Sequence, residues 1–186
     1  MSPGFDFDAP SHEVARQLLG AWLTLDGVGG LIVETEAYDV TDEASHSFGG
    51  PTPRSATMFG PPGHWYVYRS YGLHWCLNLV CEAAGHGAGV LLRALEPLEG
   101  LERMRERRGE RHADRLLCAG PGRLCQALGV SSLHNGWAVN APPFELKPPE
   151  AAVACQVGVR IGISKAVDVP WRFGVAGSRF LSRPFR

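Results

Sequence analysis

Two charged side chains lie inside apolar stretches of the sequence, where an ionised group needs a partner. Glu36 occurs in LIVETEAY, residues 31–38, and Arg93 is the charged residue of AGVLLRAL, residues 88–95. Burying an unpaired charge is costly, so we expect Glu36 and Arg93 to form an ion pair. The pair can be purely structural. Alternatively, the guanidinium lowers the pKa of the Glu36 carboxyl and keeps it anionic, which is the form that a general base requires.

Glu34 precedes Glu36 by two residues and lies on the same face of a predicted strand. An ordinary structural role is one interpretation of this residue. The other is a carboxylate pair of a carbohydrate-active enzyme, because same-face neighbours in a strand lie about 7 Å apart, within the range for inverting glycosidases. One strand cannot readily place two carboxylates on opposite sides of a sugar, so this alternative is the weaker one.

Aromatic side chains gather on or beside the strands that carry these charges. They either fill the core or form a slot for a flat ring. Tyr38 shares a strand face with Glu36, so a planar ligand stacked on Tyr38 would place its attached atoms near the carboxylate. Asn78 is predicted to be a buried amide that bonds either to the backbone or to the edge of a base. The other aromatic candidates are Trp65, Tyr66, Tyr68 and Trp75.

Histidines and cysteines are concentrated between His64 and His86, but their spacing fits no familiar zinc pattern. Alternation along a strand sends Cys81 to the face opposite His74 and Cys76, so one ion could not easily collect them. We therefore expect no zinc site in this span. The five cysteines of the chain are interpreted as free, mostly buried thiols.

Composition predicts one enlarged globular domain, because 45% of the 186 residues are hydrophobic and 20% are charged. No apolar stretch approaches the ~20 residues of a membrane helix, and the first residues lack the order of a signal peptide, so we expect a cytoplasmic protein.

Charge is distributed unevenly along the chain. Residues 1–50 hold nine acidic residues and one basic residue, a formal charge of −8. Because the whole chain carries −1, the other 136 residues carry +7, and only two of the 18 cationic residues are lysines. Arginine suits forked recognition of phosphate, so nucleic acid is a candidate partner.

Hydrophobic periodicity and turn residues divide the chain into short elements. We predict a helix over residues 11–20, capped by Ser11, and a long packed loop over residues 39–64. The aromatic runs at 65–71 and 73–81 predict a hairpin whose tip is at Tyr71 and Gly72. The other predicted elements are strands over 31–38, 88–95, 160–164 and 170–175, a helix that starts at Pro97, a glycine-led helix over 120–129 and a Pro-rich connection over 140–150.

Motifs in order along the chain resemble those of the alkyladenine (3-methyladenine, methylpurine) DNA glycosylase family. They are VETEAY, DEASHS, TPR, MF, PPG, YVY, YG, CLN, LLRALEPLEG, CAGPGRLCQALG, RIGIS, and RF, V and GS within residues 172–178. The resemblance runs from about Ala15 to Ser182, nearly the whole chain, and the combination is far more specific than any one motif.

The resemblance implies one α+β glycosylase domain over residues 1–186, similar to methylpurine-DNA glycosylases and formyltransferase C-terminal domains. Such a domain has a bent, mainly antiparallel β-sheet, surrounding helices and a protruding hairpin that inserts into DNA. Residues 1–10 are expected to be a loosely ordered tail.

For the chemistry, the resemblance makes Glu36 the general base that activates water against the anomeric carbon. Arg93 and the backbone carbonyl of Ile161 would be the other contacts of that water. The family reaction is monofunctional hydrolysis without metal or cofactor. A Schiff-base lyase needs an amine nucleophile, and neither Lys147, in the Pro-rich connection, nor Lys165, just beyond RIGIS, is an obvious choice.

For the base, the resemblance places Tyr38, His46 and Tyr68 around an extruded purine. The bulk of Asn78 would disfavour the 2-amino group of guanine. Tyr71 at the hairpin tip resembles the wedge that fills the gap left in the duplex.

The implied partner is double-stranded DNA that contains damaged purines such as 3-methyladenine, 7-methylguanine and hypoxanthine, and the product is an abasic site. Candidate contacts to the DNA backbone are Arg69, Gly122 and Arg123. Gly122 and Arg123 lie at a glycine-led helix start, which can hold phosphate. We expect a monomer associated with a bacterial nucleoid and not with a membrane. The alternative is a damaged-base binding module without catalysis.

Two features depart from the family pattern. Tyr38 and His46 are separated by one residue fewer than in vertebrate members, which bears on how the His46 loop closes. Arg69 and Ser70 precede Tyr71 where an apolar pair is usual, which bears on the depth of the wedge. The chain also lacks the basic N-terminal extension of those larger relatives, so it resembles a compact bacterial form.

Overall fold

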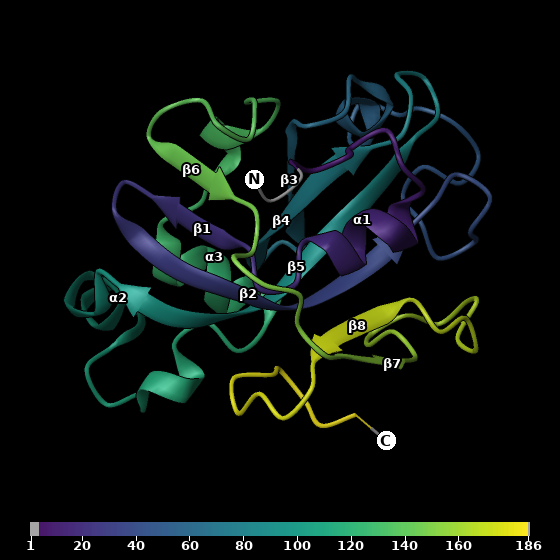
Figure 1. Ribbon diagram of the computed structural model, residues 1–186. Coiled ribbons are helices and arrows are strands. Elements are labelled where there is room, and N and C mark those ends of the chain that lie inside the picture. Colours follow the sequence, from purple (N-terminus) through teal and green to yellow (C-terminus); the bar gives the residue numbers. More distant parts are fainter. Residues whose placement is uncertain (1–3, 186) are drawn as a thin grey trace.

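The computed structural model describes residues 4–185 as an α+β fold around one sheet, in which the paired strands all run antiparallel (Figure 1). The strand order is β3-β4-β5-β2-β1-β6, and β8 joins β2 and carries β7. The strands are β1 (Trp22–Leu25), β2 (Val28–Tyr38), β3 (Trp65–Ser70), β4 (His74–Cys81), β5 (Ala88–Glu99), β6 (Phe144–Lys147), β7 (Cys155–Gly158) and β8 (Arg172–Val175). The α-helices are α1 (Ser11–Gln17), α2 (Leu101–Arg108) and α3 (Pro121–Leu128), and short 3-10 turns are η1 (Ala56–Phe59), η2 (Asp114–Leu116) and η3 (Ser132–His134).

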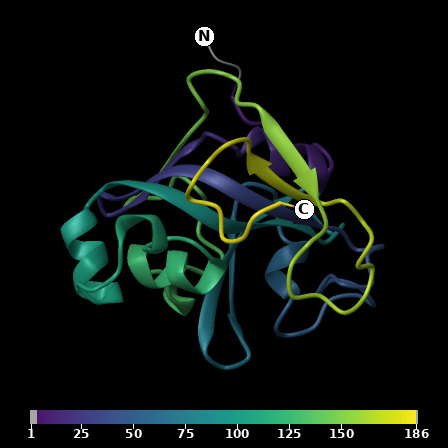
Figure 2. The same ribbon diagram turned by 90° about the horizontal axis from the view of Figure 1, so that it is seen from below.

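The two sides of the sheet carry different helices. Seen along its edge, the sheet has α1 on one side and α2 and α3 on the other (Figure 2). The β3–β4 hairpin projects from the sheet between α3 and the segment of residues 39–64 (Figure 2). One hydrophobic core joins these layers, and its fully buried side chains include Leu18, Trp65, Leu79, Leu95, Met104 and Phe173. No helix among the described residues has both the length and the apolar character that crossing a membrane requires.

Strand β2 does not keep the simple alternation that the sequence predicts. Its register against β5 slips between Ile32 and Glu34 and again directly after Glu34. Strict alternation would place Ile32 on the face of Glu34 and Glu36, yet Ile32 lies in the same core as Ala37. The slips have the character of a β-bulge, which redirects the side chains of one strand. Glu34 and Glu36 therefore leave the core face that Ile32 occupies.

The predicted hairpin and the glycine-led helix are confirmed. β3 pairs with β4 from Trp65 opposite Leu79 to Ser70 opposite His74, and α3 covers the residues expected to be helical.

The helix predicted to start at Pro97 is wrong, because Pro97 lies within β5 and α2 begins only at Leu101. Gly100 makes the turn between them with φ 69°. A Cβ at Gly100 would lie 2.8 Å from the carbonyl oxygen of Gly27, so this position requires glycine.

Three smaller predictions also fail. Residues 160–164 form no strand, and part of the Pro-rich connection forms β6, which pairs with β1. Ser11 is not a cap, since it is the first residue of α1 and its amide donates to Glu82 Oε1 at 2.9 Å.

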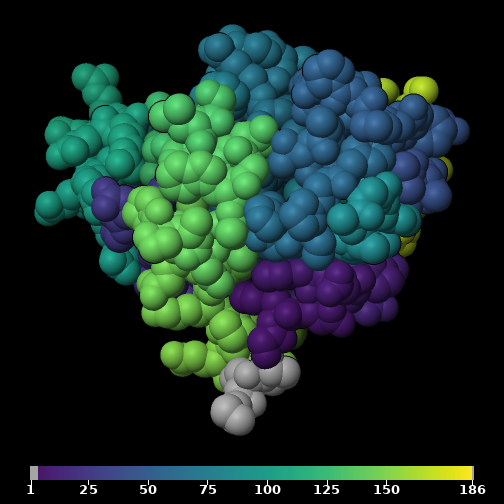
Figure 3. Space-filling view, turned by 90° about the horizontal axis from the view of Figure 1, so that it is seen from above, coloured from purple at the N-terminus to yellow at the C-terminus, as the bar shows by residue number. Residues whose placement is uncertain are grey.

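The N-terminal segment is packed over the residues that the structure describes, from residue 4 onward. The rings of Phe5 and Phe7 stack at 5.2 Å and pack against the core, and Ala9 is buried. The space-filling view shows this segment (purple) lying against its neighbours (Figure 3). The loosely ordered tail expected over residues 1–10 is therefore not found at residues 4–10, and residues 1–3 lie outside the described residues.

Candidate active site

Glu36 lies near the end of β2, and its carboxylate is completely buried. The Tyr38 hydroxyl donates to Oε2 at 2.9 Å, and Arg93 Nη1 donates to the same oxygen at 3.4 Å. The backbone amide of Ile161 donates to Oε1 at 2.7 Å. The ion pair predicted between Glu36 and Arg93 is therefore confirmed. The resemblance implicated the carbonyl oxygen of Ile161, whereas the contact made here is by its amide.

Burial raises the pKa of Glu36 above its ordinary value of 4.5, against the lowering effects of Arg93, the Ile161 amide and the Tyr38 hydroxyl. The expectation of a lowered pKa is wrong, because it counted the guanidinium and not the loss of hydration. A raised pKa brings the carboxyl closer to neutral pH, where a general base is most effective. Burial and the charge of Glu36 also raise the pKa of Tyr38, so its phenol stays protonated and donates to the carboxylate.

Glu34 belongs to a buried ion network beside this site. Its Oε1 accepts hydrogen bonds from Arg93 Nε at 3.1 Å, from Arg172 Nε at 2.8 Å and from the Ser182 hydroxyl at 2.8 Å. Two guanidinium groups thus share one carboxylate, which supports the structural interpretation of Glu34. Arg93 also bonds to both Glu34 and Glu36, so its guanidinium occupies the space between the two carboxylates. A glycosidase would need that space for the sugar.

A cavity of about 580 Å³, within the range of small-molecule pockets, opens beside Glu36. Tyr38, Arg93 and Ile161 hold the carboxylate on one side and line the cavity on the other, so Glu36 lies behind them. Four more of the predicted site residues line it: His46, Tyr68, Tyr71 and Asn78.

Aromatic rings form one wall of this cavity. The His46 ring stands edge-on to Tyr68 with centroids 4.4 Å apart, and its Nδ1 lies 3.2 Å from the Tyr66 hydroxyl. Desolvation and the charge of Arg54 lower the pKa of His46, so the imidazole is neutral at neutral pH. The Arg54 guanidinium lies 5.1 Å from the centre of the Tyr68 ring. Arg54 belongs to the TPR motif but was not predicted as a site residue, since its turn-rich loop offers no periodic pattern.

Asn78 is buried in β4 and lines the cavity. Its Nδ2 donates to the carbonyl oxygen of Tyr66, its cross-strand neighbour, at 3.1 Å. This bond holds the amide against the cavity wall, as expected of a buried amide that bonds to backbone.

The tip of the β3–β4 hairpin exposes large apolar surface. Tyr71 is 87% exposed and Leu73 is 71% exposed. Tyr71 has φ 50°, which is unusual for a residue with a side chain. Arg69 is exposed beside the tip, where its guanidinium lies over Trp75 and its carbonyl oxygen accepts a bond from Arg54. Exposed apolar side chains of this kind often mark surfaces that contact another molecule.

The start of α3 adjoins the cavity through Pro121. A Cβ on Gly122 would lie 2.8 Å from His74 Cβ, so this glycine allows the helix to approach β4 closely. Gly122 therefore has a packing role, whereas Arg123 is exposed and stays a candidate contact to DNA.

Arg160 was not predicted, although it joins three segments around the cavity. Its guanidinium pairs with Asp42, with Nη2 3.0 Å from Oδ1, and donates to the carbonyl oxygen of Ala37 at 2.9 Å. It also lies 4.7 Å from the centre of the Tyr38 ring. The pair is buried, since the side chains of Arg160 and Asp42 are 0% and 4% exposed. A lone charge in the apolar run VGVRIGI was an available signal, the same one that revealed Arg93.

Two further side-chain predictions have different outcomes. Lys165, judged from its sequence position to be a poor candidate for a nucleophile, lines the cavity. The thiols are free and mostly buried, as predicted, with Cys155 the exposed one among them.

Comparisons with known proteins identify one family over nearly the whole chain. Residues 5–179 match the family model described as Methylpurine-DNA glycosylase (MPG). A protein of Nitrosospira multiformis named "Putative 3-methyladenine DNA glycosylase" is 64% identical over 184 residues, which cover 99% of this chain and 95% of that relative. Relatives with the same name occur in Nitrobacter winogradskyi (58% identical over 180 residues, 97% and 86% covered) and Agrobacterium fabrum (54% over 179 residues, 96% and 91% covered).

Asp42→Asn is expected to lower the free energy of unfolding by about 3–5 kcal/mol, because it leaves Arg160 buried and charged without its partner. Urea denaturation followed by tryptophan fluorescence measures the loss. The matched control is Asp26→Asn, which breaks a pair with Arg103 whose side chains are 68% and 43% exposed. That change should cost below about 1 kcal/mol. Equal losses in the two variants would show that the buried pair contributes no more to the free energy of unfolding than the exposed pair does.

Proposed function

This chain belongs to the methylpurine-DNA glycosylase family, and we propose that it is a base excision repair enzyme that hydrolyses the N-glycosidic bond of alkylated purines such as 3-methyladenine in DNA. The observation that carries the proposal is the position of Glu36. A buried carboxylate lies directly behind an aromatic cavity and is held by the side chain of Tyr38, that of Arg93 and the backbone of Ile161.

The cavity offers aromatic faces to a base that has rotated out of the duplex, a motion that costs roughly a few kcal/mol. Methylation gives 3-methyladenine and 7-methylguanine a positive charge, which the rings of Tyr38 and Tyr68 would attract by about 0.5–2 kcal/mol. Arg160 and Arg54 lie over these two rings. Arg160 is not among the residues that line the cavity, so the cavity side of the Tyr38 ring is left for the base, whereas Arg54 lines the cavity beside Tyr68.

In the proposed reaction a water molecule attacks the anomeric carbon while Glu36 accepts a proton from that water. The bond from the anomeric carbon to the purine nitrogen breaks, and its electron pair neutralises the cationic base. The carboxylate also stabilises the positive charge that develops on the sugar. Glu36 accepts two hydrogen bonds at Oε2 and one at Oε1, so Oε1 keeps an acceptor position for the attacking water. A neutral purine such as hypoxanthine would also need a proton donor to its ring.

The β3–β4 hairpin is the part that we propose enters the duplex. It projects from the sheet and carries Tyr71 at its exposed tip (Figure 2). Stacking of Tyr71 in the vacated space would offset part of the cost of base rotation. Arg69 and Arg123 are exposed and are proposed to contact phosphates. One copy of the chain supplies the cavity, the carboxylate and the hairpin, so we propose that a monomer acts.

Glu36→Gln is expected to slow single-turnover release of 3-methyladenine by about 10²–10⁴-fold while binding to abasic DNA is retained, because glutamine cannot accept the proton from water. Chromatography of bases freed from methylated and inosine-containing DNA measures the rate and identifies the substrates.

Glu99→Gln, at an exposed position of β5, is the matched control and should release bases at the parent rate. A binding module without catalysis would release no base in any variant. Loss of release in Lys165→Ala to the extent seen in Glu36→Gln would contradict hydrolysis and point to the lysine amine.

The excision rate is expected to fall as the pH is lowered, with a midpoint above 4.5. The sign follows from Glu36, which must be ionised to accept a proton and whose pKa burial raises above that value. Single-turnover rates between pH 4.5 and pH 8, corrected for uncatalysed release, test this. The acid limb should be absent in Glu36→Gln, and an identical limb in that variant would assign it to another group.

Tyr71→Ala is expected to weaken excision of correctly paired lesions more than that of mismatched ones, because a mismatched base costs less to rotate out. Paired and mismatched duplexes that carry the same lesion give the ratio of rates. Leu133→Ala removes another exposed side chain, one that belongs to η3 and not to the hairpin tip, and serves as the control. Equal losses on both duplexes would argue against Tyr71 as the wedge.

A further inference from the structure

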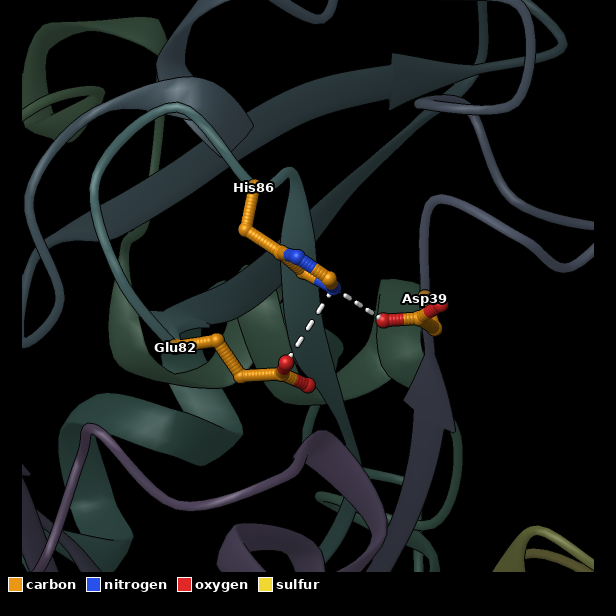
Figure 4. A group of neighbouring side chains, drawn as sticks. All are labelled: Asp39, Glu82 and His86. Atoms are coloured by element: carbon orange, nitrogen blue, oxygen red, sulfur yellow. Dashed lines mark hydrogen bonds and ion pairs between the residues drawn. The ribbon is translucent and has the colours of Figure 1, made fainter.

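Three polar side chains converge outside the cavity, where β2 and β4 end (Figure 4). Asp39 directly follows β2, Glu82 directly follows β4, and His86 lies in the loop between β4 and β5. His86 Nε2 lies 2.6 Å from Asp39 Oδ2 and 3.1 Å from Glu82 Oε2. One potential metal-ligand atom from each residue lies within 4.8 Å of those of the other two. Two stretches of chain that are distant in sequence, residue 39 and residues 82–86, therefore point one nitrogen and two oxygens at a common position.

Both carboxylates are held in place through their other oxygen atom. Asp39 Oδ1 accepts hydrogen bonds from the amide of Thr41 at 2.9 Å and from its hydroxyl at 2.6 Å. Glu82 Oε1 accepts a hydrogen bond from the amide of Ser11 at 2.9 Å. Outer bonds of this kind orient metal ligands in proteins. They leave Asp39 Oδ2 and Glu82 Oε2 directed at the imidazole.

The position is shielded but has a path to solvent. The side chains of Asp39 and Glu82 are 13% and 19% exposed, whereas that of His86 is 37% exposed. The partly exposed imidazole gives an ion an entry path to the two carboxylates.

We propose that Asp39, Glu82 and His86 bind one divalent transition-metal ion of the zinc class. An imidazole and two carboxylates are ligands that zinc accepts. Ligand atoms about 2.0–2.2 Å from an ion lie about 3.0–3.5 Å apart, so the closest pair in this cluster needs to separate by less than about 1 Å. Magnesium prefers oxygen ligands and holds its own waters, so it should bind much more weakly here.

The ion would join the end of β2 to the β4–β5 loop, one residue beyond Tyr38. Its role is structural, because none of its three ligands lines the cavity. The site can therefore be tested by ion binding, without measuring activity.

Calorimetric titration of Zn²⁺ into the ion-free full chain tests the site. The Cys155→Ser parent is used because the exposed Cys155 thiol could bind zinc by itself. We expect one equivalent of zinc to bind this parent and the dissociation constant to rise at least tenfold in His86→Gln and in Asp39→Asn. His112→Gln, which changes an exposed histidine after α2, is the matched control and should bind as the parent does. Mg²⁺ at the same concentrations should give no saturable binding.

X-ray absorption of the zinc complex of the parent provides a measurement that does not depend on variants. One imidazole nitrogen with oxygen ligands and no sulfur would support the site. Sulfur ligands, absence of zinc binding by the parent, or equal dissociation constants in the parent and both site variants would each overturn it.

Discussion

The burial of two carboxylates within an apolar sheet is the constraint on which the rest of this structure depends. Glu34 and Glu36 have no exposed surface, and each isolated charge would cost several kcal/mol without partners. Arg93 and Arg172 supply the opposite charge. Because the four residues come from β2, β5 and β8, satisfying them requires these strands to lie side by side, with β2 in the middle.

The two carboxylates are not equivalent, and the difference separates structure from chemistry. Glu34 accepts hydrogen bonds from two guanidinium groups and a serine hydroxyl, and these bonds fix it to β5, β8 and the C-terminal segment. Glu36 receives one guanidinium bond at 3.4 Å and two bonds from neutral donors. Incomplete compensation leaves burial as the dominant effect on Glu36 and raises its pKa. The Glu36 carboxylate is therefore a stronger proton acceptor than an ordinary glutamate, as a general base requires.

The cavity depends on a rigid sheet and on two irregular segments that the sheet cannot position by itself. Residues 39–64 contribute His46, and residues 160–165 contribute the Ile161 amide. The buried pair of Arg160 and Asp42 joins these segments and places a guanidinium over Tyr38. Loops held on a rigid scaffold in this way commonly carry the functional groups of a protein.

The sequence by itself determined the pairing of Glu36 with Arg93 and the hairpin with Tyr71 at its tip, because a charge in an apolar strand needs a partner and turn residues act locally. Through the family resemblance, motifs also indicated seven of the residues that line the cavity. Only the tertiary structure decided the register slips in β2, the location of β6 and the Arg160–Asp42 pair, whose members lie 118 residues apart. The direction of the pKa shift of Glu36 was likewise undetermined, since desolvation depends on how distant segments pack around a group and not on its neighbours in the chain.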